Sequence, residues 1–215
     1  MLLKTEQIRV KYLGLMIVLS LYSHGSSAEA IQCTPAQNKT EKKLCTPQFQ
    51  ASVEQLNNLS LTTLLITDAP LRLIKDSQQL WSKRIAECKS TRCYEQQLEQ
   101  RIDQLNFYTS INQTLTQHYL KFENGKMADQ AVHLQIHQLS KDNIKIEGLA
   151  YRNPNNALDK QNIPFLAYST VSEKNTITDN ENDCKYQFHY QKAILKVTTE
   201  QKGCERFSGI YRLYD

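Results

Sequence analysis

The chain of 215 residues contains only six glycines, and it lacks the short motifs that mark common catalytic sites. Few glycines leave few positions at which the backbone can approach a phosphate or a substrate closely. No G-x-S-x-G nucleophile elbow, H-E-x-x-H zinc helix or phosphate-binding glycine loop is present. We therefore expect that the protein is not an enzyme, has no catalytic residues and needs no cofactor.

The sequence also lacks a strong charge of one sign. Its formal net charge is +4, and no basic stripe with interleaved aromatic residues is present. Nucleic-acid-binding domains carry such stripes because they must neutralise phosphates. We therefore expect no nucleic-acid partner. Internal repeats and long low-complexity segments are absent too, so the length fits one globular domain or two small ones.

Long apolar runs are absent except near the start of the chain. Three basic residues precede an apolar run of eleven residues at 12–22, and 26–30 (SSAEA) supplies small residues in an A-x-A arrangement. This order is typical of a secretory signal peptide, whereas a membrane-spanning helix needs about 20 apolar residues. We predict that residues 1–30 are removed, that the mature chain has no stable membrane insertion, and that it is a periplasmic or secreted bacterial protein.

Six cysteines follow this segment. An even number of cysteines in an exported chain indicates a disulfide framework rather than free thiols. Structural zinc sites usually have two short cysteine pairs, and only one such pair is present here, so we expect no metal. The cysteines are Cys33, Cys45, Cys88, Cys93, Cys184 and Cys204.

These cysteines allow fifteen pairings. We favour Cys33–Cys45, Cys88–Cys93 and Cys184–Cys204, because only this pairing keeps every bridge local. The main alternative exchanges partners among the first four cysteines. A flat meander of three strands would separate the last pair by about 9–10 Å, so the last bridge requires a curled sheet or cysteines in loops. Each bridge is expected to contribute about 2–4 kcal/mol by restricting the unfolded chain.

Residues 31–127 have the pattern of a helical domain. Apolar residues recur at spacings of three and four in a helix that starts near Pro47, in a second helix at 71–88 and in a third that starts near Cys93. We expect the third helix to continue, bent or broken, to Leu120. A disulfide between the second and third helices would fasten an antiparallel helical hairpin at its tip.

Residues 128–215 change to a period of two. Alternating, β-branched or aromatic segments separated by polar turns are typical of strands. The segments are 132–137, 144–147, 165–171, 186–190, 194–199 and 207–214. We expect an antiparallel, curled sheet of five or six strands. The predicted fold class is therefore α+β, with a disulfide-stapled domain of three or four helices followed by a small antiparallel β domain.

Four cysteines and a tryptophan within residues 31–107 have the order and spacing of a known family. The matching residues are Cys33, Thr40, Glu41, Cys45, Gln79, Trp81, Arg84, Cys88, Cys93, Arg101, Ile102 and Leu105. On these residues the segment resembles the N-terminal domain of the LprI-type lysozyme inhibitors, with Tyr94 where the family usually has leucine. Residues 203–212 resemble the closing strand of a small β domain that follows such segments in some bacterial exported proteins.

The resemblance implies an exported, disulfide-stapled helical domain and, for the family's named example, inhibition of host lysozyme. It does not identify any residue of this chain as inhibitory. In the family, the tryptophan that Trp81 matches lies on a helix above the third cysteine. We therefore expect Trp81 to belong to the structural core, packed on the Cys88–Cys93 bridge and on Leu98 and Ile102, rather than to contact a ligand.

The leading functional hypothesis is a non-enzymatic protein that inhibits a lysozyme or another peptidoglycan-cleaving hydrolase. Lysozyme cleaves with paired carboxylates in a cleft, so an inhibitor need only present a rigid plug. A mildly positive chain gains no long-range attraction from a basic c-type lysozyme. Local complementary charge is available in the acidic run 179–183, through Asp179, Glu181 and Asp183 beside Cys184. The alternative interpretation of this run is a plain solvated turn.

Two other functions fit the same sequence. One is a periplasmic immunity protein against a dedicated cell-wall toxin. The other is an interaction module of the cell envelope with no enzyme target. A neighbouring gene for a secreted hydrolase would favour the first, and capture of envelope scaffold proteins would favour the second.

Two histidines lie on one face of a predicted strand. His133 and His137 have Gln135 between them, so all three side chains would point the same way. No Asp, Glu or Cys obviously joins them to complete a metal site. We expect a solvated face of the sheet at these positions.

Overall fold

A computed structural model of the chain describes residues 30–33, 38–109, 115–156 and 161–214, and the predicted signal peptide lies outside these ranges except for Ala30. The helices are α1 (Lys39–Leu44), the short 3-10 helix η1 (Pro47–Phe49), α2 (Gln50–Ile66), α3 (Leu71–Ala86) and α4 (Thr91–Thr109). The strands are β1 (Thr116–Glu123), β2 (Lys126–Met127), β3 (Val132–Gln138), β4 (Asn143–Tyr151), β5 (Asn162–Thr170), β6 (Thr176–Asp179), β7 (Cys184–Gln191), β8 (Ile194–Thr198) and β9 (Gly209–Tyr214), with the 3-10 helix η2 (Glu205–Phe207) before β9.

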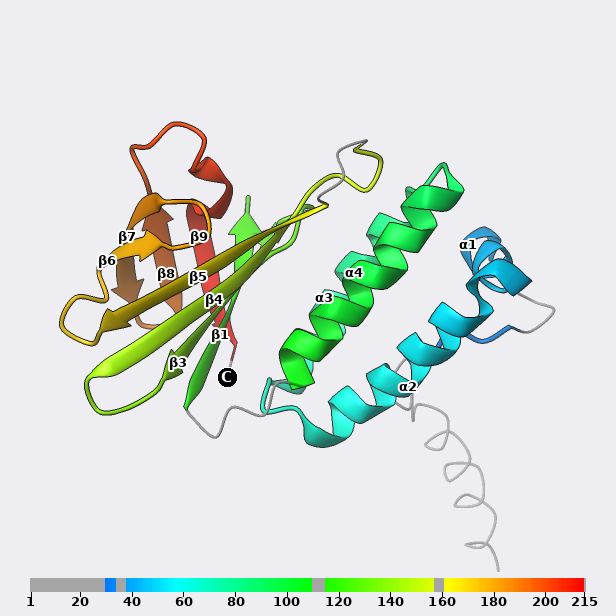
Figure 1. The fold of residues 1–215 in the computed structure, drawn as a ribbon, viewed down its shortest axis with the longest axis horizontal. Helices are drawn as coiled ribbons and strands as arrows, with labels where there is room; N and C mark the ends of the chain where they lie inside the picture. Colours follow the sequence, from blue (N-terminus) through cyan, green and yellow to red (C-terminus); the bar gives the residue numbers. More distant parts are fainter. Residues whose placement is uncertain (1–29, 34–37, 110–114, 157–160, 215) are drawn as a thin grey trace, which may run out of the picture.

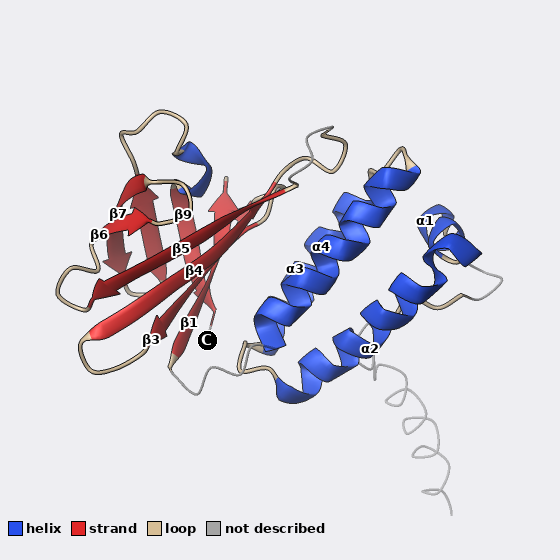
Figure 2. Cartoon of the chain, in the orientation of Figure 1, coloured by secondary structure: helices blue, strands red, loops and turns tan. Residues whose placement is uncertain are grey.

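The helices and the sheet form successive layers (Figures 1 and 2). The hairpin of α3 and α4 lies beside the sheet, and α2 packs on the side of α4 away from the sheet. The α+β class predicted from the sequence, with helices first and a curled antiparallel sheet second, is confirmed. Within the described ranges, no helix is both long and apolar enough to cross a membrane.

The change from helix to strand comes earlier than predicted. α4 ends at Thr109 and β1 begins at Thr116, so the prediction that this helix continues to Leu120 is wrong. Pairing of β1 with β3 on one side and β9 on the other satisfies its backbone groups in the extended form. Residues 116–127, which were assigned to the helical domain, therefore belong to the sheet.

The nine strands found in the described residues form one antiparallel sheet. Their order is β5-β4-β3-β1-β9-β8-β7-β6, and β2 pairs with β1 alone. The prediction of five or six strands missed β1, β2 and β6. The sheet curls until its two edge strands meet, and the backbone N–H of Asn180 donates to the carbonyl of Leu166 at 2.8 Å. Apolar side chains such as Phe165, Phe188 and Tyr211 fill the interior.

Asp179 joins the two edges of the curled sheet. Its side chain is fully buried at the end of β6, and Oδ1 accepts hydrogen bonds from the backbone N–H of Leu166 and of Glu181, each at 3.1 Å. Its Oδ2 accepts a third hydrogen bond from Nδ2 of Asn182 at 2.6 Å. The prediction that Asp179 is an exposed contact for a target is therefore wrong, because the carboxylate holds β6 against β5.

Replacing Asp179 with alanine is expected to lower the free energy of unfolding by about 2–4 kcal/mol, because three hydrogen bonds to a buried carboxylate are lost. Urea unfolding followed by circular dichroism measures the change. Asp183→Asn is the control, since Asp183 is exposed on the following turn and its replacement is expected to change stability by less than about 0.5 kcal/mol. Equal effects of the two substitutions would contradict the role of Asp179.

The helices and the sheet share a buried cluster. Leu73, Leu80 and Tyr108 of the α3–α4 hairpin pack with Leu120 of β1 and Tyr151 of β4. A second cluster lies between α2, α3 and α4, and a third fills the curled sheet. The predicted helical domain and the predicted β domain, which the sequence analysis divides at residue 127, are therefore joined by apolar contacts across the face of the sheet.

The three disulfide bonds have the sequential pairing that the sequence favours. The Cα atoms are 5.5 Å apart in Cys33–Cys45, 5.5 Å in Cys88–Cys93 and 5.8 Å in Cys184–Cys204. The last bridge joins the start of β7 to the loop before η2, as a curled sheet permits. The three bonds indicate an oxidising environment outside the cytoplasm.

Trp81 lies in the structural core, as predicted. It is buried with Cys88, Cys93 and Leu98, and half-buried Ile102 packs against the same cluster. The indole Nε1 donates a hydrogen bond of 2.8 Å to the backbone carbonyl of Gln97 on α4. The tryptophan therefore fixes α3 to α4 both by packing and by a directed bond.

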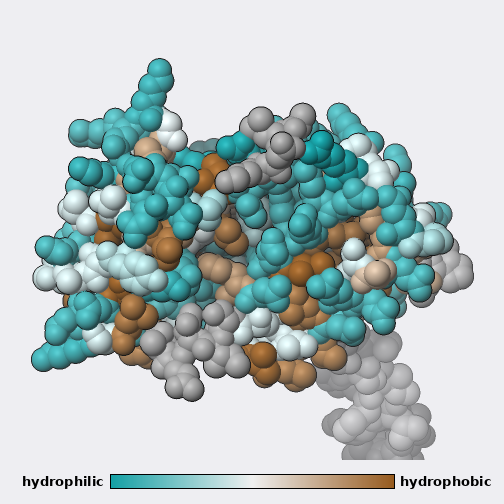
Figure 3. Space-filling view, in the orientation of Figure 1, coloured by the Kyte–Doolittle hydropathy of each residue, from teal (hydrophilic) through white to brown (hydrophobic). Residues whose placement is uncertain are grey.

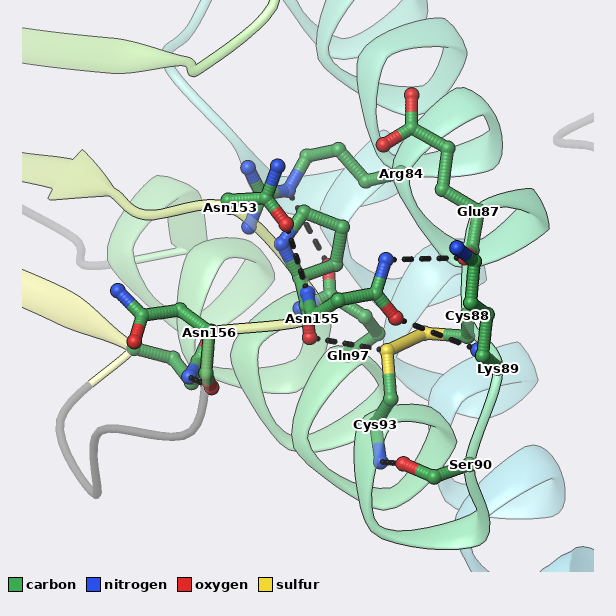
Figure 4. The surroundings of a disulfide bond; sticks show 12 residues. Arg84, Glu87, Cys88, Lys89, Ser90, Cys93, Gln97, Asn153, Asn155 and Asn156 are labelled. Carbon is green, nitrogen blue, oxygen red and sulfur yellow. Dashed lines mark hydrogen bonds between the residues drawn. A yellow bond between two sulfur atoms is a disulfide. The ribbon is translucent and has the colours of Figure 1, made fainter.

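The loop after β4 holds the tip of the α3–α4 hairpin (Figure 4). Nδ2 of Asn155 donates to the carbonyl of Glu87 at 3.1 Å, and its Oδ1 accepts from the backbone N–H of Lys89 at 3.3 Å. The Sγ atom of Cys93 lies 3.0 Å from the carbonyl oxygen of Pro154. The disulfide and this loop together set the position of the hairpin relative to β4.

Candidate protein-binding groove

An open groove with a volume of about 370 Å³ lies between α4 and the strands β4 and β5. Its lining combines three carboxylates with apolar side chains. The lining residues are Asp103, Phe107, Glu147, Gly148, Leu149, Pro164, Phe165, Leu166 and Glu181. Figure 3 shows apolar surface in the hollow between the sheet and the helices, surrounded by hydrophilic side chains.

Gly148 lines the groove with its backbone. It follows the predicted strand segment 144–147, and β4 continues through it to Tyr151. A Cβ atom at this position would lie 2.7 Å from Cδ2 of Leu134 and 2.8 Å from the carbonyl oxygen of His133. Glycine is therefore needed here because β3 approaches β4 too closely for any side chain.

Glu147 carries a fixed negative charge in the groove. Its carboxylate lies 3.1 Å from Nε2 of His137 and 2.7 Å from Nζ of Lys145. The hydrogen bond from His137 lowers the pKa of Glu147 to about 2, and Lys145 adds to this effect against the opposing influence of burial. Glu147 is therefore ionised at any pH near neutrality.

Two further carboxylates flank the apolar floor. Partial burial on α4 raises the pKa of Asp103 above its ordinary value. Glu181 is exposed on the turn between β6 and β7, and its backbone N–H is held by the buried carboxylate of Asp179. Negative charge beside the apolar side chains of Phe107 and Leu166 suits a lysine or arginine side chain, whose stem is apolar and whose end is cationic.

The three acidic residues singled out in the sequence have different positions. Glu181 lines the groove, Asp179 is buried beneath the turn, and Asp183 is exposed on the turn without lining the groove. Asp183 has a φ of 55°, a left-handed conformation that aspartate tolerates better than most residues. The acidic run therefore contributes one side chain to the groove, one to the buried joint between β5 and β6, and one to the exposed turn.

A layer of buried polar side chains lies between the α3–α4 hairpin and the sheet, next to the groove. We call it the polar layer, and its members are all buried. They are Ser77, Arg84, Gln97, Gln100, Arg101, Gln104, Tyr108, His118, His133 and Tyr151. The prediction of a solvated face at His133 and His137 is therefore wrong, because the helices cover this face of β3.

Hydrogen-bond directions in the polar layer determine the state of His133. Arg101 can only donate, and its Nη1 bonds to Oε1 of Gln104 at 2.5 Å. The amide Nε2 of Gln104 must then donate to Nε2 of His133, 2.8 Å away, while Nδ1 of His133 bonds to the hydroxyl of Tyr108 at 2.5 Å. Burial and the charge of Arg101 lower the pKa of His133 to about 3, so this histidine is neutral.

His133 is therefore not available as a metal ligand, since both ring nitrogens already have partners. Nε2 of His137 faces the carboxylate of Glu147, and its Nδ1 lies 3.0 Å from Oγ1 of Thr116. In the part of the chain that the structure describes, no group of three or more His, Cys, Asp or Glu residues is arranged to hold a metal ion.

Sequence reasoning missed most of the groove and the polar layer. A signal for the polar layer was present in α4, where Gln97, Gln100, Gln104 and Tyr108 recur at the spacing of a buried helical face. Such a stripe of amides and arginine is easily taken for a solvated face. Asp103 and Glu147 had no comparable signal, because only the packing of α4 on β4 brings them together.

Comparisons with known proteins do not assign the groove to a family or to a function. No protein-family model, curated protein or solved structure matches the chain.

Proposed function

We propose that the protein is an exported, non-enzymatic binding protein, periplasmic or secreted, that inhibits a lysozyme or another peptidoglycan-cleaving hydrolase. The observation that carries the proposal is the acidic groove with an apolar floor on a disulfide-stapled scaffold. A basic side chain of the hydrolase would enter the groove, its stem on Phe107 and Leu166 and its charge near Asp103 and Glu181. Occupying the groove in this way would hold the inhibitor over the hydrolase cleft.

The proposal accounts for attraction between two proteins that both have positive net charge. Interface charge acts locally, because screening in physiological salt limits interactions between exposed charges to about 8–10 Å. Asp103 and Glu181 lie on one groove together with Glu147, which is paired with Lys145, so a basic hydrolase meets negative charge there despite the net charge of +3 that residues 31–215 carry. The three disulfides limit the ordering cost of binding, since the scaffold is already rigid.

A non-enzymatic role is supported by the location of the perturbed groups. Burial lowers the pKa of His133 to about 3 and that of His118 to about 4, and both rings lie in the polar layer away from solvent. Glu147 is ionised and already paired with Lys145 and His137. The two histidines therefore lack the access to substrate that general acid–base catalysis requires, and Glu147, which lines the groove, is held in its ionised form by its partners.

The oxidised mature chain is expected to slow lysis of a cell-wall suspension by a c-type, g-type or bacterial muramidase. The double substitution Asp103→Asn with Glu181→Gln is expected to weaken inhibition about tenfold or more, since each lost charge contact contributes about 1 kcal/mol or more to binding. Inhibition by the unaltered protein should also decline with added salt.

The matched control is Glu54→Gln with Asp129→Asn, which removes the same charge from exposed positions outside the groove. This control should inhibit as the unaltered protein does. No slowing of any enzyme in the panel would refute the proposal. Inhibition that the groove and control variants retain equally would place the contact elsewhere. Inhibition confined to one bacterial toxin would identify the immunity function rather than defence against host lysozyme.

A second candidate, an envelope interaction module, is favoured by an apolar patch at the corner between α2 and α3. Leu61, Leu65, Ile66 and Leu71 are exposed there, Leu65 to 74%. Contiguous exposed leucines of this kind often mark a protein contact. Capture of envelope scaffold proteins that is lost in Leu65→Glu, with no effect on any hydrolase, would favour this candidate.

A further inference from the structure

Arg84 and Arg101 are both buried in the polar layer and line the same small cavity, without an ion pair to a carboxylate; the charge of Glu87 acts on Arg84 only from a longer distance. Arg84 is 5% exposed and Arg101 is 1% exposed, and neither forms an ion pair with any described residue. Their hydrogen-bond acceptors are neutral: Gln97, Gln100, Gln130 and the carbonyl of Arg152 for Arg84, and Ser77 and Gln104 for Arg101. Buried charges in proteins are normally paired, so two positive charges here require a compensating group.

A small cavity lies against both arginines. Its volume is about 10 Å³, and α3, α4 and β4 supply most of its lining, including Arg84, Gln100, Arg101 and Tyr151. Three buried polar atoms of these lining residues have no hydrogen-bond partner: Nε2 of Gln100, Nε of Arg101 and the hydroxyl of Tyr151. Unpartnered buried polar atoms are rare in native proteins, and three around one cavity point to a bound species that accepts hydrogen bonds.

The chemistry of the lining distinguishes an anion from a water molecule. A cavity of this size holds one water-sized species. A water molecule that accepts from Nε2 of Gln100 and Nε of Arg101 would need acceptors for its own two protons, and of the three unpartnered atoms only the hydroxyl of Tyr151 can accept. Oε1 of Gln100 already accepts from Arg84 and from Gln97, and the amide oxygens of Gln97 and Gln104 each accept from a guanidinium group. A monatomic anion accepts from every donor and also offsets the two positive charges.

We infer that the cavity between α3, α4 and β4 binds a single chloride ion through Arg101, Gln100 and Tyr151, with the positive charge of Arg84 in the cavity wall. The ion links the helical hairpin to the sheet, because its donors come from α4 and β4. Sulfate and phosphate are excluded by size. The inference concerns the scaffold and does not depend on the proposed function of the groove.

Chloride is expected to stabilise the folded protein when ionic strength is held constant with gluconate. Raising chloride from about 1 to 300 mM should lower the equilibrium constant of unfolding about tenfold or more, in a saturable manner. Replacing the chloride with sulfate should give no such effect. Crystals grown in sodium bromide should show an anomalous difference peak within hydrogen-bonding distance of Nε of Arg101.

Two variants test the site itself. Gln100→Glu supplies a built-in negative charge, so this variant should be stable without chloride and should not respond to it. Tyr151→Phe removes one donor with little change in shape, and it should weaken the chloride response several-fold. Lys83→Gln is the matched control, because it removes an exposed positive charge next to Arg84 and should leave the response unchanged.

Equal stability in chloride and gluconate, together with no bromide peak in the cavity, would overturn the inference and assign the cavity to water only. A chloride response that Gln100→Glu and Tyr151→Phe both retain would also overturn it, since the ion would then bind elsewhere. If Gln100→Glu fails to fold, Tyr151→Phe and the bromide peak decide the matter.

Discussion

Replacing Trp81 with alanine is expected to lower the free energy of unfolding by about 3–5 kcal/mol, as for other large buried side chains. The indole lies in the cluster that holds Cys88, Cys93 and Leu98, so its removal leaves a cavity between α3 and α4. The hydrogen bond from Nε1 to the carbonyl of Gln97 is lost as well. Urea unfolding of the oxidised protein, followed by circular dichroism, measures the loss.

Trp81→Phe separates the two contributions. Phenylalanine retains most of the buried apolar surface and loses the hydrogen bond, so a smaller loss of about 1–2 kcal/mol is expected. An unchanged melting temperature for Trp81→Ala would show that the tryptophan is not part of the core and would reopen its assignment as a contact residue.

The second large effect is a loss of stability in mild acid. Burial lowers the pKa of His133 to about 3 and that of His118 to about 4, from an ordinary value of 6.5. His133 lies between Gln104 and Tyr108, and His118 lies 3.8 Å from the carboxylate of Asp68. Both rings are therefore neutral in the folded protein at pH values where the unfolded chain has already bound protons.

The direction of the pH effect follows from this difference in protons bound. As the pH falls from about 6.5 to 4.5, the unfolded state binds protons that the folded state rejects, so folding is progressively disfavoured. Each histidine contributes a slope of about 1.4 kcal/mol per pH unit in this range. Glu147, whose pKa in the folded protein is about 2, causes a further loss of stability only below about pH 4.5, the ordinary pKa of a glutamate.

Chemical unfolding measured at intervals from pH 7 to 4.5 tests this expectation. The variant His133→Gln should lose stability at pH 7 but show a slope reduced by about 1.4 kcal/mol per pH unit, since one buried titrating group is gone. His189→Gln is the control, because His189 is exposed on β7, and its slope should match that of the unaltered protein. Stability that does not change between pH 7 and 4.5 would contradict the neutral, buried state of both rings.

The fold class was readable from the sequence because its signals are local. The spacing of apolar residues gave α3 between Leu71 and Ala86, and the alternation of side chains gave β3 and β7. The sequential disulfide pairing was also favoured, since short loops close at the lowest entropic cost. β1 was missed because its pairing with β3 and β9, rather than its own pattern, holds it extended.

The site depended on contacts that have no local signal. Glu181, predicted as a possible contact for a target, lies on the turn that lines the groove, but Asp179 of the same run faces inward to join β5 and β6. His133 and Gln135 alternate as a solvated strand face would, yet the α3–α4 hairpin covers them. Local sequence cannot distinguish a polar face in water from one that packs against another polar face.

The sequence alone therefore determined the order of helices and strands and the oxidised cysteines, since each follows from the spacing of neighbouring residues, while the resemblance of residues 31–107 to a known family implied the packing role of Trp81. Only the tertiary structure decided where the hairpin lies on the sheet. That placement buries Arg84 and Arg101 together and brings Asp103 of α4 beside Glu147 of β4. Both the groove and the cavity exist because residues far apart in the chain meet across this interface.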